Sequence, residues 1–137
     1  MTQRQIEIIE ETWDYVIMNT EEAGMIFYAR LFETNPSLRK LFNSDIVTQS
    51  QKLISMITFI VNKINNLDGV VKDIKMLGQR HVNYEVKPEH YSAVGATLLW
   101  TLEQGLGSKW NDEVSKAWSD VYTLLSNTMM EGASEKK

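Results

Sequence analysis

Apolar residues recur along almost the whole chain at the three- and four-residue spacing that is typical of amphipathic helices. The longest regular stripe runs from Val114 to Met129, where the apolar positions follow i, i+3, i+4, i+7, i+8, i+11 and i+15. No stretch of useful length shows the strict alternation of apolar and polar residues that indicates a half-buried strand. The pattern therefore predicts an all-α protein.

Helix starts and breaks divide the chain into about seven helices joined by short loops. Thr2 and Thr20 stand where an N-cap residue is expected, and Pro36 can open a short helix because its missing N–H would be unpaired there anyway. The other apolar faces span residues 6–17, 25–32, 47–64, 70–81 and 91–102. We find no repeat and no linker, so we predict one domain over residues 1–131 and a polar, frayed tail over 132–137.

Composition and charge limit the kinds of binding partner that we expect for this chain. The 137 residues are 43% hydrophobic and 23% charged, which is ordinary for a globular domain with one core. The net charge is −4 and there is no basic stripe, so neither nucleic acid nor an anionic membrane is an expected partner. The N-terminus has no apolar signal segment and no apolar run reaches membrane-spanning length, so we expect a cytoplasmic location.

The numbers of cysteines and histidines exclude several kinds of functional site. The chain has no cysteine, which excludes disulfides, thiolate nucleophiles and iron–sulfur clusters. It has two histidines, His81 and His90, and neither has a glutamate three positions earlier, so a di-iron carboxylate site lacks its ligands. A glycine-rich phosphate loop and a Gly-x-Ser-x-Gly motif are also missing from the sequence.

His81 extends the apolar stripe of its helix, because it follows Leu77 by four residues and Ile74 by seven. Two interpretations stay open at this point. The first is a core histidine with one satisfied hydrogen bond. The second is a lone axial ligand of haem iron, since the porphyrin supplies four ligands itself. Tyr28 and Gln49 are further candidates, although a tyrosine on an apolar face usually fills the core and a glutamine in a first turn is usually solvated.

Several stretches together resemble a known family. The run FYARLFETNPSLRKLF at 27–42, LGQRH at 77–81, KPEHY at 87–91, Val94-Gly95, and Ala117-Trp118 with Tyr122 are similar to the globin domain of flavohaemoglobins and to single-domain bacterial haemoglobins. The order and spacing of these pieces match from about residue 6 to residue 130. The resemblance implies a globin fold around a haem b cofactor.

The resemblance also implies a role for each matching residue. It makes His81 the proximal ligand of the iron, and it makes Tyr28 and Gln49 the distal pair that faces the gas. The residues that it implies pack against the haem or lie behind the proximal histidine are Phe42, Leu53, Ile57, Leu77, Val86, Tyr91 and Val94. We expect His90, in the first turn after Pro88, to be exposed and not to bind iron.

Two positions depart from the family pattern. The glutamate that completes the network of Tyr91 in the family is replaced by Ala133, and the nearest acid is Glu131. The loop between Phe42 and Gln49 is three residues shorter than the family pattern, so the start of the distal helix is less firmly assigned.

The resemblance implies tight binding of oxygen, with nitric oxide and CO as further ligands, because hydrogen bonds from Tyr28 and Gln49 stabilise partial negative charge on bound oxygen. It also implies oxidation of nitric oxide to nitrate with electrons from a separate reductase, or simple carriage of gas. One alternative is a haem-based redox or gas sensor in which Tyr28 ligates ferric iron. A second is a haemless globin-fold interaction protein.

Overall fold

The computed structural model describes residues 2–19, 22–42, 45–83 and 87–135. Within these ranges every regular element is a helix, which confirms the predicted all-α class. The elements are α1 (Gln3–Asn19), α2 (Ala23–Thr34), η1 (Pro36–Leu41), α3 (Ile46–Asn62), η2 (Ile64–Val70), α4 (Val71–Asn83), α5 (Pro88–Leu106), η3 (Gly107–Lys109) and α6 (Asp112–Glu135), where η marks a 3₁₀ helix. None of the described helices combines the length and apolarity needed to cross a membrane.

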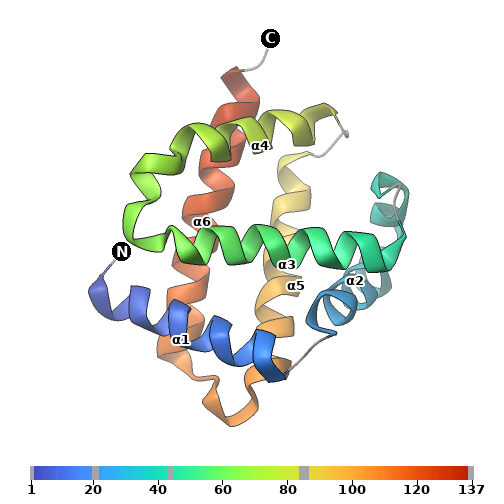
Figure 1. Cartoon of the computed structure of the whole chain (residues 1–137). Helices are drawn as coiled ribbons and strands as arrows, with labels where there is room; N and C mark the ends of the chain where they lie inside the picture. The colour runs from blue at the N-terminus through green and yellow to red at the C-terminus, as the bar shows by residue number, and fades with distance from the viewer. Residues whose placement is uncertain (1, 20–21, 43–44, 84–86, 136–137) are drawn as a thin grey trace.

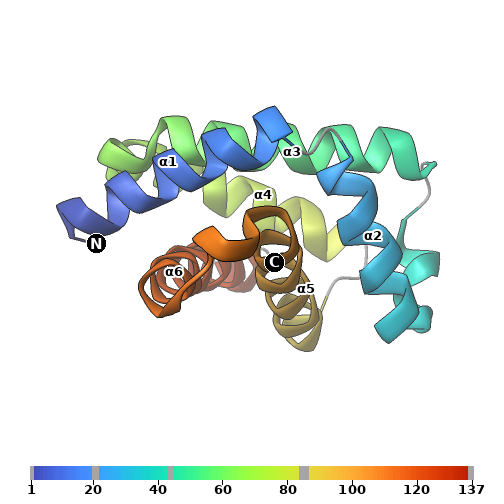
Figure 2. The same ribbon diagram turned by 90° about the horizontal axis from the view of Figure 1, so that it is seen from below.

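The helices are arranged in two layers that cross steeply. Figures 1 and 2 show α1 and α3 side by side in one layer, and α5 and α6 running across them in the other. Helix α4 packs along the C-terminal half of α6, and α2 packs against both α3 and α5. The space enclosed by α2, α3, α4 and α5 is where the sequence predicts the functional site.

Capping follows local sequence chemistry. The Thr2 hydroxyl accepts a hydrogen bond from the Gln5 N–H at 3.1 Å, as predicted. The Asp45 carboxylate accepts from the Thr48 N–H at 2.9 Å, and hydrogen bonds from Thr48 lower the pKa of this carboxyl. This cap begins α3 at Ile46, three residues before Gln49. The predicted cap at Thr20 lies outside the described residues.

Two tryptophans tie the layers together. The Trp13 and Trp118 rings lie 6.0 Å apart between α1 and α6, and both side chains are buried. The Trp13 indole N–H donates to the Thr58 hydroxyl at 3.0 Å, and the Trp118 N–H donates to the Thr12 hydroxyl at 2.9 Å. Both buried donors are therefore satisfied, as burial of an indole N–H requires.

The predicted end of the last helix is wrong. We expected a frayed tail from Gly132, whereas α6 continues to Glu135. Gly132 is buried where α6 crosses α4, and a Cβ there would fall 2.5 Å from the Lys75 Cα. The Lys75 ammonium also lies 3.1 Å from a carboxylate oxygen of Glu131. Packing against α4 therefore holds the final turns of α6, despite their polar sequence.

Candidate functional site

A close crossing of α2 and α3 forms one wall of the site. A Cβ placed on Gly24 would lie 2.7 Å from the Ser50 Cβ and 2.9 Å from the Ser50 backbone oxygen. Only a glycine permits this approach, which brings the two helix backbones together. Tyr28 lies one turn after Gly24 on α2, and Gln49 is adjacent to Ser50 on α3, so the crossing brings their backbones close to one junction. Sequence reasoning missed Gly24 and Ser50, whose signal is a pair of small residues on two neighbouring helices.

Three phenylalanine rings surround the Tyr28 ring. Their centroids lie 4.9 Å away for Phe27, 5.3 Å for Phe42 and 5.8 Å for Phe32, and the Phe27 and Phe42 rings meet it edge-on. Such edge contacts each add roughly 0.5–1.5 kcal/mol beyond simple burial. The tyrosine is therefore held by packing, which orients its hydroxyl without a hydrogen bond.

The Tyr28 hydroxyl is available for a hydrogen bond. The Tyr28 residue is only 5% exposed, yet its hydroxyl has no hydrogen-bond partner among the described residues. No fully enclosed polar side-chain atom in the described part of the chain lacks a partner, so the Tyr28 oxygen must border accessible space. Burial raises the pKa of Tyr28 to about 12, which keeps the hydroxyl protonated and able to donate near neutral pH.

The other distal candidates lie along α3. Gln49 and Leu53 are half-buried, and Ile57 is buried. Successive spacings of four residues place the three side chains along one face of the helix. Leu53 and Phe42 both pack against the main core, so they close the α2–α3 wall with apolar surface.

On the opposite side, α4 carries His81 and Leu77. Leu77 is half-buried and packs against a second cluster of buried apolar side chains that includes Ile74 and Tyr91. His81 lies in the last turns of α4, one turn after Leu77, but its side chain is outside the described residues, as is all of Val86. The backbone thus places His81 on the helix that faces α3 and α5 across the site.

Helix α5 supplies the third wall through Tyr91 and Val94. Tyr91 is buried and its backbone carbonyl accepts a hydrogen bond from the Tyr122 hydroxyl at 2.6 Å. The Tyr122 ring lies against Gly95, where a Cβ would fall 2.6 Å from a ring carbon. Burial raises the pKa of both tyrosines, so both hydroxyls stay neutral at physiological pH. Val94 is half-buried and packs on the main core.

The structure clarifies the departure near Tyr91. Glu131 is 62% exposed at its side chain and pairs with Lys75 on the molecular surface, and Ala133 has no carboxylate to offer. The acid nearest to the expected position is therefore directed to a lysine, which leaves the family network without this glutamate.

His90 is half-buried rather than exposed as we expected. Its Nδ1 accepts a hydrogen bond from the Lys87 N–H at 3.0 Å, and it lies in the first turn of α5. The imidazole therefore contributes to the helix start through this local hydrogen bond.

This set of walls fits haem. Helices α3, α4 and α5 present apolar residues that are only half-buried, namely Leu53, Leu77 and Val94, and a buried tyrosine opens its unpartnered hydroxyl to accessible space. Haem suits this arrangement because its flat, apolar ring would cover the half-buried aliphatic side chains of α3, α4 and α5. A polar ligand on its iron could then accept a hydrogen bond from the Tyr28 hydroxyl.

A model of the Globin family matches residues 26–129, which is about three quarters of the chain. The chain is a globin. Haem, in the standard form haem b, is therefore its cofactor, and diatomic gases are the ligands that this family supports. His81, Tyr28 and Gln49 lie inside the matched region.

Relatives and solved structures agree with this assignment. The chain is 30% identical to a protein named Flavohemoprotein from Rhodopirellula baltica, over 97% of this chain but only 34% of that protein. It is 25% identical to a protein named Neuroglobin from Tetraodon nigroviridis, over 96% of this chain and 92% of that protein. A bacterial globin from Campylobacter jejuni superposes with a TM-score of 0.84 at 26% identity, covering 98% of this chain and 97% of that one. The chain thus spans about a third of the length of the flavohemoproteins that it matches.

Proposed function

We propose that this globin binds oxygen tightly, with His81 as the proximal ligand of the haem iron and with Tyr28 and Gln49 as hydrogen-bond donors to the gas. The observation that supports this most directly is the Tyr28 hydroxyl, which is held by aromatic rings, has no partner among the described residues and borders accessible space. A hydroxyl that is held in place and has no partner can donate a hydrogen bond to a ligand that enters the site.

When bound, haem supplies a ferrous iron that takes up a diatomic gas and passes electron density to it. The neutral Tyr28 hydroxyl donates to the partial negative charge that results, and the Gln49 amide can donate a second bond. Such charge-assisted bonds are worth about 1.5–3 kcal/mol, or roughly 10- to 150-fold in affinity. The apolar side chains of Leu53, Ile57, Leu77 and Val94 exclude water, which strengthens the bond further.

We further propose nitric oxide dioxygenase activity, with the balance NO + O₂ + e⁻ → NO₃⁻. The support is the 30% identity to a flavohemoprotein over nearly the whole of this chain. The electron comes from a reductase, and this chain aligns with about a third of the length of that relative. Without such a donor, each protein molecule would act once and otherwise carry gas.

The first experiment is a set of absorption spectra of the reduced, oxygenated and CO-bound protein. A globin that binds these ligands shows a distinct Soret band in each state, whereas a protein that takes up no haem shows none and contradicts the proposal. The second experiment is stopped-flow measurement of oxygen release from Tyr28→Phe. We expect release to quicken by roughly 10- to 150-fold. A release rate equal to that of the wild type, with Tyr15→Phe as the control, would overturn the role of Tyr28.

The amount of nitrate formed per protein molecule distinguishes nitric oxide dioxygenase activity from simple carriage of gas. With a ferredoxin-type or flavin reductase present, we expect many nitrates per protein molecule. One nitrate per protein molecule under several reductases contradicts the dioxygenase proposal and leaves a gas carrier.

The alternative is a haem-based sensor in which Tyr28 ligates ferric iron. That role needs a tyrosinate whose charge the ferric iron itself stabilises. We favour the neutral donor, because the Tyr28 hydroxyl is packed among aromatic rings and has no partner among the described residues. A tyrosinate charge-transfer band in the ferric protein near neutral pH would support the sensor instead.

A further inference from the structure

Two buried glycines bring the backbones of α4 and α6 into direct contact, namely Gly78 on α4 and Gly132 on α6. A Cβ on Gly78 would overlap the carbonyl oxygen of Met129 and would lie 2.6 Å from its carbonyl carbon. A Cβ on Gly132 would overlap the carbonyl oxygen of Lys75. Carbon atoms that are not bonded keep about 3.5–4.0 Å apart, so alanine at either position would push the two helices apart.

Further contacts hold the same crossing. The Lys75 ammonium on α4 lies 3.1 Å from a carboxylate oxygen of Glu131 on α6. The Met129 side chain is buried in the second apolar cluster, against which Leu77 also packs. Gly78 lies in the interior of α4, where glycine is intrinsically less favourable than alanine. The packing that its missing side chain permits offsets this local cost.

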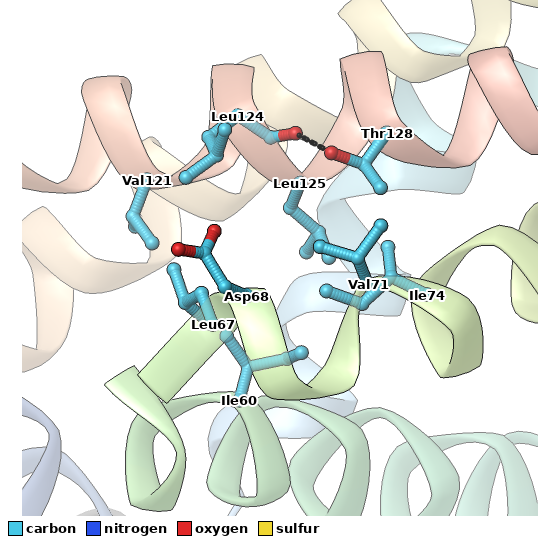
Figure 3. A pocket seen from close by; sticks show the side chains of 9 residues that line it. All are labelled: Ile60, Leu67, Asp68, Val71, Ile74, Val121, Leu124, Leu125 and Thr128. Carbon is cyan, nitrogen blue, oxygen red and sulfur yellow. Dashed lines mark hydrogen bonds between the residues drawn. The ribbon is translucent and has the colours of Figure 1, made fainter. Parts of the chain in front are cut away.

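Helix α4 depends on α6 for its orientation, because α6 is its main packing partner among the described elements. At the start of α4, a cavity of about 50 Å³ lies between α4, η2 and α6, and Val71 and Ile74 line it on the α4 side (Figure 3). The close backbone contacts come after this cavity, at Lys75 and Gly78. They therefore fix the half of α4 that leads to His81.

We propose that Gly78 and Gly132 are positioning residues for the proximal ligand, because the crossing that they permit sets where α4 holds His81. The inference rests on the proposed function, since it requires His81 to bind the haem iron. Gly78 precedes His81 by three residues, which is less than one helical turn, so a shift at the crossing moves the histidine backbone as well. A metal ligand must be held within about 0.5 Å of its productive position. With Ala133 in place of the family's glutamate, backbone packing performs this task here.

The first test is the iron–histidine stretching band in resonance Raman spectra of the ferrous, ligand-free holoprotein. We expect Gly78→Ala and Gly132→Ala to shift this band to lower frequency and to broaden it, because α4 moves away from its place. Transfer of haem to a haem-free acceptor globin should also become several-fold faster. Thr12→Val is the matched control, since it weakens the packing of α6 on α1 instead of on α4, and its band should equal that of the wild type.

A second test detaches the ligand from α4. In His81→Gly supplied with free imidazole, the iron ligand is no longer part of the helix. Adding Gly78→Ala to this background should leave the iron–imidazole band unchanged. A shift of the same size in both backgrounds would mean that Gly78 acts on the pocket as a whole, which overturns the inference. If Gly78→Ala does not fold, Gly132→Ala serves in both backgrounds, because it lies in the last turn of α6, where the helix can yield.

Amide hydrogen exchange of the holoprotein gives a readout that does not depend on the iron. Backbone amides of residues 75–83 should exchange faster in Gly78→Ala, whereas those of α1 should not change. Exchange and Raman bands equal to those of the wild type in both glycine variants would overturn the inference and leave His81 as the ligand. A wild type without an iron–histidine band contradicts the proposed role of His81 itself, and the inference with it.

Discussion

Gly24 on α2 lies directly against Ser50 on α3, so that any side chain at residue 24 would press on the Ser50 Cβ and backbone oxygen. Gln49 is the neighbour of Ser50, and Tyr28 is one turn from Gly24. The distance between the two helices therefore sets how close the two proposed distal donors come to one ligand. Stability and ligand binding are coupled at this single crossing.

Gly24→Ala should separate α2 from α3, because the added methyl group would overlap the Cβ, Cα and backbone oxygen of Ser50. We expect a loss of about 1–3 kcal/mol in the free energy of unfolding, as for other overpacked sites. Oxygen release should also quicken, because Tyr28 moves away from its acceptor. Urea unfolding and stopped-flow release measure the two effects. Ala29→Met adds more volume at an exposed position of α2 and should change neither.

Thr12→Val should destabilise the contact between α1 and α6. The Thr12 hydroxyl accepts the hydrogen bond of the buried Trp118 N–H, and valine keeps the shape of threonine without the acceptor. A buried donor without a partner costs about 1–3 kcal/mol. Urea unfolding followed by tryptophan fluorescence gives the difference. Thr12→Ser retains the hydroxyl and should recover most of the stability. Equal destabilisation by valine and serine would indicate that packing of the threonine methyl matters instead.

Tyr28 should make stability fall at alkaline pH. Its pKa is about 12 in the folded protein against an ordinary value near 10, so its contribution is complete below pH 10 and is lost as the pH rises through 12. The loss amounts to roughly 3 kcal/mol. Tyr28→Phe should flatten this part of the profile, measured by urea unfolding from about pH 8 to about pH 12. An alkaline slope that is the same in Tyr28→Phe and the wild type would contradict the buried environment of the hydroxyl.

Local sequence signals predicted the helices well, because periodicity, caps and breakers act within a few residues of one another. Thr2 caps α1 and Gly107, with a φ of 55°, follows the end of α5, as expected of these residue types. The end of α6 was missed because Gly132 is held by Lys75 of α4, which lies 57 residues earlier in the chain. A polar composition indicates a tail only where no other helix packs against it.

The candidate site also contains features that the sequence predicted and features that it did not. Family resemblance named the candidates on three helices, and the structure arranges those helices around one space. The half-buried state of His90 and the close approach of Gly24 to Ser50 were not predicted, because each depends on contacts that periodicity does not encode. The contact between Gly24 and Ser50 joins two helices, and no single stretch of sequence specifies it.

The two histidines offer a direct test of the proximal ligand. His81→Gly should lose haem, because the chain has no cysteine and its other histidine, His90, is engaged at the start of α5. Free imidazole should restore the Soret band, since it can enter the space that the side chain leaves. His90→Ala should keep haem and lower only the urea midpoint, because it removes the acceptor of the Lys87 N–H. Haem retention by His81→Gly without imidazole, measured by the Soret absorbance after gel filtration, would show that the iron does not depend on His81.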